Sequence, residues 1–185
     1  MTGAALGALF VVLAIREIAW CWPVGIANAL LFFVVYWRAR LYGAAVLQLL
    51  YLATSVYGWY EWLHGGEGRG ALAVSRTPRR WAALLGLAGL LGTIALGLFL
   101  RHRTDAALPF TDAATTSFSL VAQWMTTRKW LESWLVWIAV DAVYVVMLGS
   151  QGLFTAGGLY FAFLVFAVVG FREWRTSMAV RQAAA

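Results

Sequence analysis

A carboxylate and several aromatic side chains share one face of an apolar segment in the last third of the sequence. The stretch WLVWIAVDAVYVV, residues 134–146, carries an aspartate in an otherwise apolar run. Side chains three or four positions apart lie on the same face of a helix. At these spacings, one stripe contains Trp130, Trp134, Trp137, Asp141 and Tyr144. Because an ionisable group inside a membrane span is costly unless it faces protein or water, this stripe predicts a binding site or a pathway.

Two further segments carry polar residues with the same periodicity. One stripe is Asp112, Thr116, Ser119 and Gln123, another is Gln48, Tyr51, Ser55, Trp59 and Trp62, and Asn28 is the lone amide of a third segment. Any one of these polar groups could simply bridge two helices, which is worth about 1 kcal/mol. Together, aromatic walls, amides and a carboxylate suit a small, planar, polar ligand, especially a cation.

Tryptophans near the ends of apolar segments have a simpler interpretation, because indoles gather at the membrane–water interface. We expect that location for Trp20, Trp37, Trp62, Trp81, Trp130 and Trp174. Trp59, Trp134 and Trp137 lie deeper in their segments and are the candidates for a ligand-binding wall.

The composition shows what kind of protein must position these residues. Of 185 residues, 63% are hydrophobic and 12% are charged, which predicts an integral membrane protein. The net charge of +6 comes from short basic clusters between apolar runs, so it indicates topology and not nucleic-acid binding. The single cysteine, Cys21, and the two histidines, His64 and His102, offer no metal or redox site, and we expect no cofactor.

The apolar runs predict an all-α protein with seven transmembrane helices, since a span needs about 20 apolar residues. They are centred on Gly3–Trp20, Trp22–Trp37, Leu41–Trp62, Trp81–Leu100, Asp112–Thr126, Trp130–Gly149 and Gly152–Phe171. The first lacks the basic start of a secretory signal, so we interpret it as a retained helix. A Gly-rich, basic stretch at 64–80 predicts an exposed linker. With the N-terminus outside, the outer loops carry four Lys and Arg residues and the inner loops carry ten, which places the linker and C-terminus in the cytoplasm.

A shift of 112 residues aligns the segment 41–62 with 153–174 without a gap. The shared G-x-x-E-W ending is the most informative match, and the same offset places Arg16 on Arg128 and Trp22 on Trp134. These matches predict two parallel three-helix units, 1–63 and 111–175, with the linker 64–80 and a linker helix 81–100 between them and a tail at 176–185.

The sequence resembles the PnuC family of bacterial nicotinamide riboside transporters. The resemblance is carried by W-P-x-G-I, L-Q-x-x-Y, Y-G-W-x-x-W, A-Q-W, R-K-x-x-E-x-W-x-x-W, the Asp141 position and the closing L-Y and G-x-x-x-W, and covers nearly the whole chain. It implies a SWEET-like arrangement of three, one and three helices, a homotrimer in the bacterial inner membrane, and passive uptake of nicotinamide riboside for NAD synthesis. By position, the substrate-binding residues would be Asn28, Gln48, Tyr51, Trp59, Gln123, Trp134, Trp137 and Asp141.

Three alternatives to this function remain open on the sequence. Thiamine or another aromatic vitamin has the same flat and polar character as nicotinamide riboside. An intramembrane enzyme would use Asp112, Glu132 and Asp141 as acid and base, but neither a nucleophile with its base nor a set of metal ligands occurs at a plausible spacing. A packing or assembly subunit would leave the inward polar stripes without a ligand.

Overall fold

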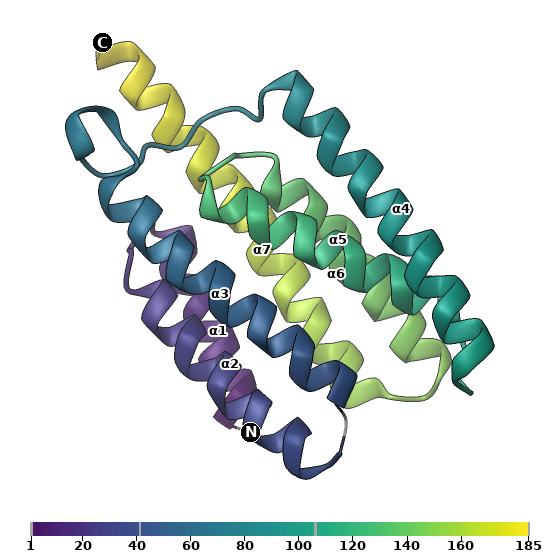
Figure 1. Cartoon of the computed structure of the whole chain (residues 1–185). Helices are drawn as coiled ribbons and strands as arrows, with labels where there is room; N and C mark the ends of the chain where they lie inside the picture. Colours follow the sequence, from purple (N-terminus) through teal and green to yellow (C-terminus); the bar gives the residue numbers. More distant parts are fainter. Residues whose placement is uncertain (1, 41, 106, 185) are drawn as a thin grey trace.

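The computed structural model describes residues 2–40, 42–105 and 107–184. Over these residues the chain forms a bundle of seven α-helices with one short 3-10 helix, η1 (Glu67–Arg69), as Figure 1 shows. The α-helices are α1 (Thr2–Ile15), α2 (Cys21–Arg38), α3 (Tyr42–His64), α4 (Arg79–Arg103), α5 (Pro109–Thr127), α6 (Ser133–Ser150) and α7 (Phe154–Ala184). The all-α prediction with seven helices is confirmed, although Leu41, where we expected the third to begin, lies outside the described residues.

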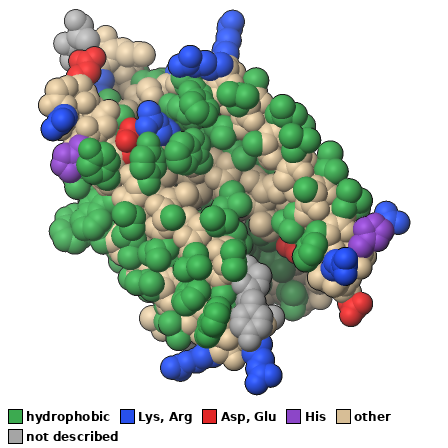
Figure 2. All heavy atoms as spheres, viewed as in Figure 1, with side chains coloured by type: hydrophobic (Ala, Val, Ile, Leu, Met, Phe, Trp, Pro, Cys, Tyr) green, Lys and Arg blue, Asp and Glu red, His purple; other side chains and the backbone are tan. Residues whose placement is uncertain are grey.

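Four of these helices are long and apolar enough to cross a membrane by length and composition, namely α2, α4, α6 and α7. Helix α1 is apolar but shorter. Helices α3 and α5 carry the polar stripes, and ten side chains of α5 are buried inside the bundle. Their lower hydropathy therefore reflects an inward-facing polar surface. Hydrophobic side chains cover the middle of the face seen in Figure 2, and most charged side chains lie near its ends.

The backbone conformation of the helix connections is similar at positions 112 residues apart. Among the described residues, positive φ angles in the helix connections include 56° at Glu17 and 49° at Lys129, and 59° at Arg40 and 73° at Gly152. Each pair is separated by 112 positions. The connections also share a hydrogen bond: Ile18 N donates to Leu13 O and Trp130 N donates to Met125 O.

The helix contacts fall into two groups. Helix α2 packs against α1 and α3, and α6 packs against α5 and α7, while α4 packs mainly against α5. Contacts of α1 with α7 and of α3 with α5 join the groups. In Figure 1, α1, α2 and α3 occupy one side of the bundle, and α4 lies along the opposite edge.

A layer of four tryptophans, Trp22, Trp62, Trp134 and Trp174, forms the core beside the linker. Trp22 meets Trp62 edge-on with ring centroids 5.4 Å apart, and Trp134 meets Trp174 in the same way at 5.3 Å. Hydrogen bonds cross between the groups: Trp62 Nε1 donates to the Thr126 carbonyl and Trp174 Nε1 to the Ala14 carbonyl, both at 3.0 Å. Residues 112 positions apart thus make the same contact in opposite directions between the two groups.

Glycines make this layer possible. A methyl group added at Gly58 would lie 2.6 Å from the Trp22 ring, and one added at Gly170 would lie 2.6 Å from the Trp134 ring. Both distances are far below van der Waals contact. The two glycines, also 112 residues apart, therefore allow each indole to lie directly on a helix backbone.

Burial corrects part of the interface prediction. Trp62, Trp130 and Trp174 are buried, with at most 7% of each residue exposed. Each lies near a helix end, but the ends of neighbouring helices and the linker cover it. By contrast, Trp20, Trp37 and Trp81 are exposed, as we expected of indoles at a membrane surface.

Most residues of the linker are exposed, as we expected, but its segment 72–77 also contacts the bundle. This segment, which we call the strap, crosses the bundle at the end where α3 and α5 finish. Leu72 N donates to Trp62 O, Ser75 N donates to Lys129 O, and Leu131 N donates to Ser75 O. Val74 is 5% exposed and joins the core. The strap docks because it covers apolar side chains that the helix ends would otherwise leave open.

Helix α7 also continues beyond its predicted end at Phe171, through the segment expected to be a tail. Met178 is buried against the core, and the Arg181 guanidinium lies 2.8 Å from a Glu17 carboxylate oxygen. These tertiary contacts stabilise extra helical turns that show no apolar run in the sequence.

Candidate substrate pocket

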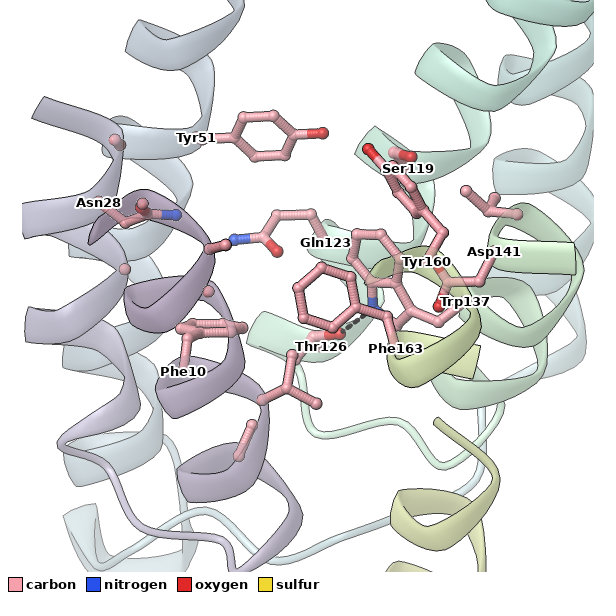
Figure 3. Close-up of a pocket in the computed structure, with 18 of the residues that line it drawn as sticks. Phe10, Asn28, Tyr51, Ser119, Gln123, Thr126, Trp137, Asp141, Tyr160 and Phe163 are labelled. Carbon is pink, nitrogen blue, oxygen red and sulfur yellow. Dashed lines mark hydrogen bonds between the residues drawn. The ribbon is translucent and has the colours of Figure 1, made fainter. Parts of the chain in front are cut away.

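The polar stripes meet around a cavity of about 400 Å³ inside the bundle, a volume in the range of small-molecule sites. Figure 3 shows side chains of α1, α2 and α3 facing those of α5, α6 and α7 across it. The lining includes Gly7, Phe10, Asn28, Phe32, Gln48, Tyr51, Ser55, Ser119, Gln123, Thr126, Trp134, Trp137, Asp141, Tyr144, Tyr160 and Phe163. Figure 3 labels Gln123 near the centre of this group.

Seven of the eight residues predicted to bind substrate line this cavity. They are Asn28, Gln48, Tyr51, Gln123, Trp134, Trp137 and Asp141. The structure thus brings together residues that are up to 113 positions apart in the sequence. Whether they bind substrate stays a prediction.

Trp59 is not among the lining residues, and 39% of it is exposed. It follows Ser55 by one helical turn, toward the tryptophan layer. At that level Trp22 and Trp62 fill the interior, so Trp59 lies at the side of the bundle. Trp59 therefore lies outside this cavity, and its binding of substrate stays a prediction.

Most lining residues form pairs separated by 112 positions, which places the cavity between equivalent surfaces of the two groups. The pairs are Gly7/Ser119, Val11/Gln123, Ala14/Thr126, Gly25/Trp137, Asn28/Val140, Ala29/Asp141, Phe32/Tyr144, Gln48/Tyr160, Tyr51/Phe163 and Ser55/Ala167. The members differ in chemistry. On α1 and α2 many are small, whereas their counterparts on α5 and α6 supply hydroxyls, an amide, an indole and a carboxyl group.

Asp141 occupies the carboxyl position that the sequence indicated. Only 5% of the residue is exposed. Within the part of the chain that the structure describes, no hydrogen bond or ion pair to its side chain is found. Two tyrosines lie nearby on the lining: the Tyr144 and Tyr160 rings are stacked, with centroids 4.2 Å apart. The wall therefore offers an acidic group beside aromatic surfaces, which suits a flat cation.

The two predicted tryptophans differ in their surroundings. Trp137 is partly exposed to the cavity, and its Nε1 donates to Thr126 Oγ1 at 3.2 Å, the dashed line in Figure 3. Trp134 is 4% exposed and packs on Gly170 and Trp174, so it is mainly part of the core. Trp137 is the better candidate for stacking on a ligand.

Several lining residues escaped the sequence prediction. Thr126 was assigned only to the end of a helix, and Phe10, Phe163 and Tyr160 lie on helices without a polar stripe. Tyr160 could have been found, because the 112-residue offset places it on Gln48. The aromatic residues Phe10 and Phe163 are indistinguishable in sequence from other apolar helix residues.

Ion pairs fasten the end of the bundle beside the strap. The Lys129 ammonium lies 3.2 Å from Glu17 Oε2, 2.9 Å from the Leu72 carbonyl and 4.4 Å from the centroid of the Trp62 ring. Arg128 pairs with Glu61 at 2.5 Å, and its guanidinium also contacts the Tyr57 hydroxyl. These contacts link the connection after α5 to α3, to the α1–α2 connection and to the strap.

Burial and pairing shift the pKa values of this cluster. Burial lowers the pKa of Lys129, although the Glu17 carboxylate opposes the shift. Burial favours the neutral form of Glu17, but hydrogen bonds from Ser177 and Arg181 and the Lys129 charge outweigh it and lower its pKa. The same holds for Glu132: burial acts against ionisation, and hydrogen bonds from Thr77 N and Oγ1 and from Arg76 lower its pKa.

Residues 1–176 match the nicotinamide mononucleotide transporter family. The chain belongs to this family. It is therefore a membrane transporter and not an enzyme, and the resemblance noted in the sequence is confirmed.

Named members of known specificity match over most of their length. The riboflavin/roseoflavin transporter RibM of Streptomyces davaonensis is 29% identical, over 94% of this chain and 83% of that protein. The nicotinamide riboside transporter PnuC of Escherichia coli is 27% identical, over 95% and 84%. A crystal structure of the vitamin B3 transporter PnuC superposes with a TM-score of 0.68 at 25% identity, over 94% of this chain and 79% of that one. The relatives thus transport more than one vitamin.

Proposed function

We propose that this chain mediates facilitated uptake of nicotinamide riboside for NAD synthesis. The observation that carries the proposal is the Asp141 side chain, which lines the cavity beside stacked tyrosines and has no cationic partner among the described residues. A permanently cationic, flat nicotinamide ring would supply the missing charge. Asn28, Gln48 and Gln123 would then hydrogen-bond the amide and ribose groups, and Tyr51, Trp134 and Trp137 would complete the wall.

The helices would form two parallel three-helix units joined by α4, in the SWEET-like arrangement of three, one and three helices. Supporting this are the positive φ angles, the crossed indole hydrogen bonds and the pocket-lining pairs, all of which recur at the same offset. The substrate would bind between the units. Both the homotrimer and the inner-membrane location rest on the family resemblance.

Transport would be passive, with the N-terminus outside and the strap and C-terminus in the cytoplasm. Among the described residues, Asp141 is the one acidic side chain buried in the pocket lining, and neither lysine nor histidine lines it. A cationic ligand gives this carboxyl group a role that needs no coupled proton or sodium ion. Net uptake would follow from cytoplasmic phosphorylation, which prevents the nucleoside from returning.

An uncharged vitamin is a second candidate, because RibM, which is similar to this chain at 29% identity, carries riboflavin and roseoflavin. Thiamine, a cation, is a further possibility that the pocket chemistry permits. Binding of nicotinamide riboside, thiamine and riboflavin to the purified protein, measured by calorimetry, separates the three. We expect measurable heat with nicotinamide riboside and much weaker binding of riboflavin.

The variant Asp141→Asn tests the charge directly. Two unit charges 4 Å apart at a protein surface attract by about 4 kcal/mol, but loss of hydration offsets much of this. We therefore expect about tenfold weaker binding of nicotinamide riboside, equivalent to about 1.4 kcal/mol, and little change for riboflavin. An equal loss for both ligands would show that Asp141 does not recognise charge.

Proteoliposomes test the passive mechanism. With the membrane potential clamped at zero, labelled nicotinamide riboside should reach the outside concentration and stop, with or without a pH or sodium gradient. Accumulation above that level under either gradient would refute passive transport. The clamp is necessary because a negative-inside potential alone concentrates a cation.

A further inference from the structure

One hydroxyl group sets the orientation of the indole that faces the pocket. Trp137 Nε1 donates to Thr126 Oγ1 at 3.2 Å, and Thr126 Oγ1 itself donates to the Ala122 carbonyl at 2.8 Å. The hydroxyl hydrogen is therefore engaged within α5, which leaves the oxygen lone pairs for the indole. With 3% of Thr126 exposed, water cannot readily replace this acceptor.

The same residue also holds the tryptophan layer. Its backbone carbonyl accepts the hydrogen bond from Trp62 Nε1 at 3.0 Å. A single turn of α5 thus fixes two indoles, with the side chain serving Trp137 and the main chain serving Trp62. A substitution at position 126 can remove the first contact and leave the second in place.

The equivalent site in the other half shows that the hydroxyl is not needed for the backbone contact. Ala14, 112 positions earlier, also accepts an indole hydrogen bond through its carbonyl, from Trp174, without any side-chain oxygen. The position equivalent to Trp137 is Gly25. The hydroxyl and the pocket indole therefore occur together in one half and are both missing from the other.

Asp141 follows Trp137 by one helical turn, so its carboxylate is another group that could orient the indole. No hydrogen bond between these two side chains occurs in the described structure, and the indole N–H is directed to Thr126. We infer that Thr126 is a positioning residue for substrate binding, which holds the Trp137 ring at the angle needed to stack on the ligand. This inference rests on the proposed function.

The test compares Thr126→Val, which has the same shape without the hydroxyl, with Thr126→Ser, which keeps it. Losing one net hydrogen bond should weaken nicotinamide riboside binding by about 3- to 10-fold in the valine variant. The serine variant should bind within about twofold of the wild type. The matched control is Thr127→Val, because Thr127 is fully buried and its hydroxyl, among the described residues, bonds only to the Trp124 carbonyl of its own helix.

A second measurement reports the indole itself without any ligand. In protein labelled with 5-fluorotryptophan, the ¹⁹F resonance of residue 137 is assigned from its disappearance in Trp137→Phe. It should shift in Thr126→Val and stay close to its wild-type position in Thr126→Ser and Thr127→Val. Melting temperatures measured on the same samples identify any general loss of folding.

The outcomes separate this inference from the proposed function. Unchanged affinity in Thr126→Val, or an equal loss in the serine variant, would overturn the positioning role. A wild-type protein that binds no nicotinamide riboside would overturn the proposed function, and the ¹⁹F shift alone would then decide whether Thr126 positions the indole. A shifted resonance with weaker binding in the valine variant only would support both.

Discussion

Removing the negative partner of a buried lysine should destabilise the strap end of the bundle. We consider Glu17→Gln, which keeps the shape of Glu17 and removes its charge. The Lys129 side chain is 5% exposed, and its ammonium lies 3.2 Å from Glu17 Oε2. The variant would leave the cation buried, and among the described residues it would keep its contacts with the Leu72 carbonyl and the Trp62 ring.

The magnitude follows from these contacts. Breaking a fully buried ion pair on one side costs about 3–5 kcal/mol. The contact with the Trp62 ring recovers about 0.5–2 kcal/mol, and loss of the half-exposed Arg181 pair adds less than about 1 kcal/mol. We therefore expect a loss of about 2–3 kcal/mol in unfolding free energy. For a chain of this length that corresponds to a fall in melting temperature of about 5–10 °C.

Thermal unfolding in detergent measures the effect, and a double variant tests its cause. Glu17→Gln with Lys129→Met removes both charges and should restore stability to within about 1 kcal/mol of the wild type, since neutral replacement of a buried pair is well tolerated. The control is Glu67→Gln, an exposed carboxylate in η1. If the double variant were as unstable as Glu17→Gln, the buried charge would not be the cause.

Two further predictions concern the core and the strap. Gly58→Ala and Gly170→Ala should each lower the free energy of unfolding by about 1–3 kcal/mol, because the added methyl group overpacks the core. The control Gly86→Ala, which has open space around it, should be neutral or stabilising by up to about 1 kcal/mol. Equal shifts in melting temperature for all three variants would contradict the close indole contacts. Glu132, whose pKa is lowered in the folded protein, contributes stability at a pH above its unfolded value of about 4.3 and loses it as pH falls through the folded value. Acidification from about pH 6 to about pH 3 should therefore lower the melting temperature less in Glu132→Gln than in the wild type, and an equal fall would show that the strap contact is not pH-sensitive.

The sequence alone determined the helices and the polar faces, because both depend on local spacing. Gln48, Gln123 and Asp141 could be assigned to inward faces since the helical period relates residues only three or four positions apart. The 112-residue offset was also visible, because similar helix endings preserve similar residue types. The choice of the eight pocket residues, however, came from the family resemblance, and seven of them line the cavity.

Only the tertiary structure decided the depth and neighbours of each side chain. Trp59 and Trp62 belong to the same polar stripe, yet their surroundings differ. Trp62 is buried in the core and donates a hydrogen bond to a residue 64 positions away, whereas Trp59 lies at the side of the bundle. The Thr126–Trp137 contact and the docking of the strap on Lys129 likewise depend on how separate elements pack. The helical periodicity of a single segment cannot predict such contacts, because they form only when segments that are distant in the chain pack together in the interior.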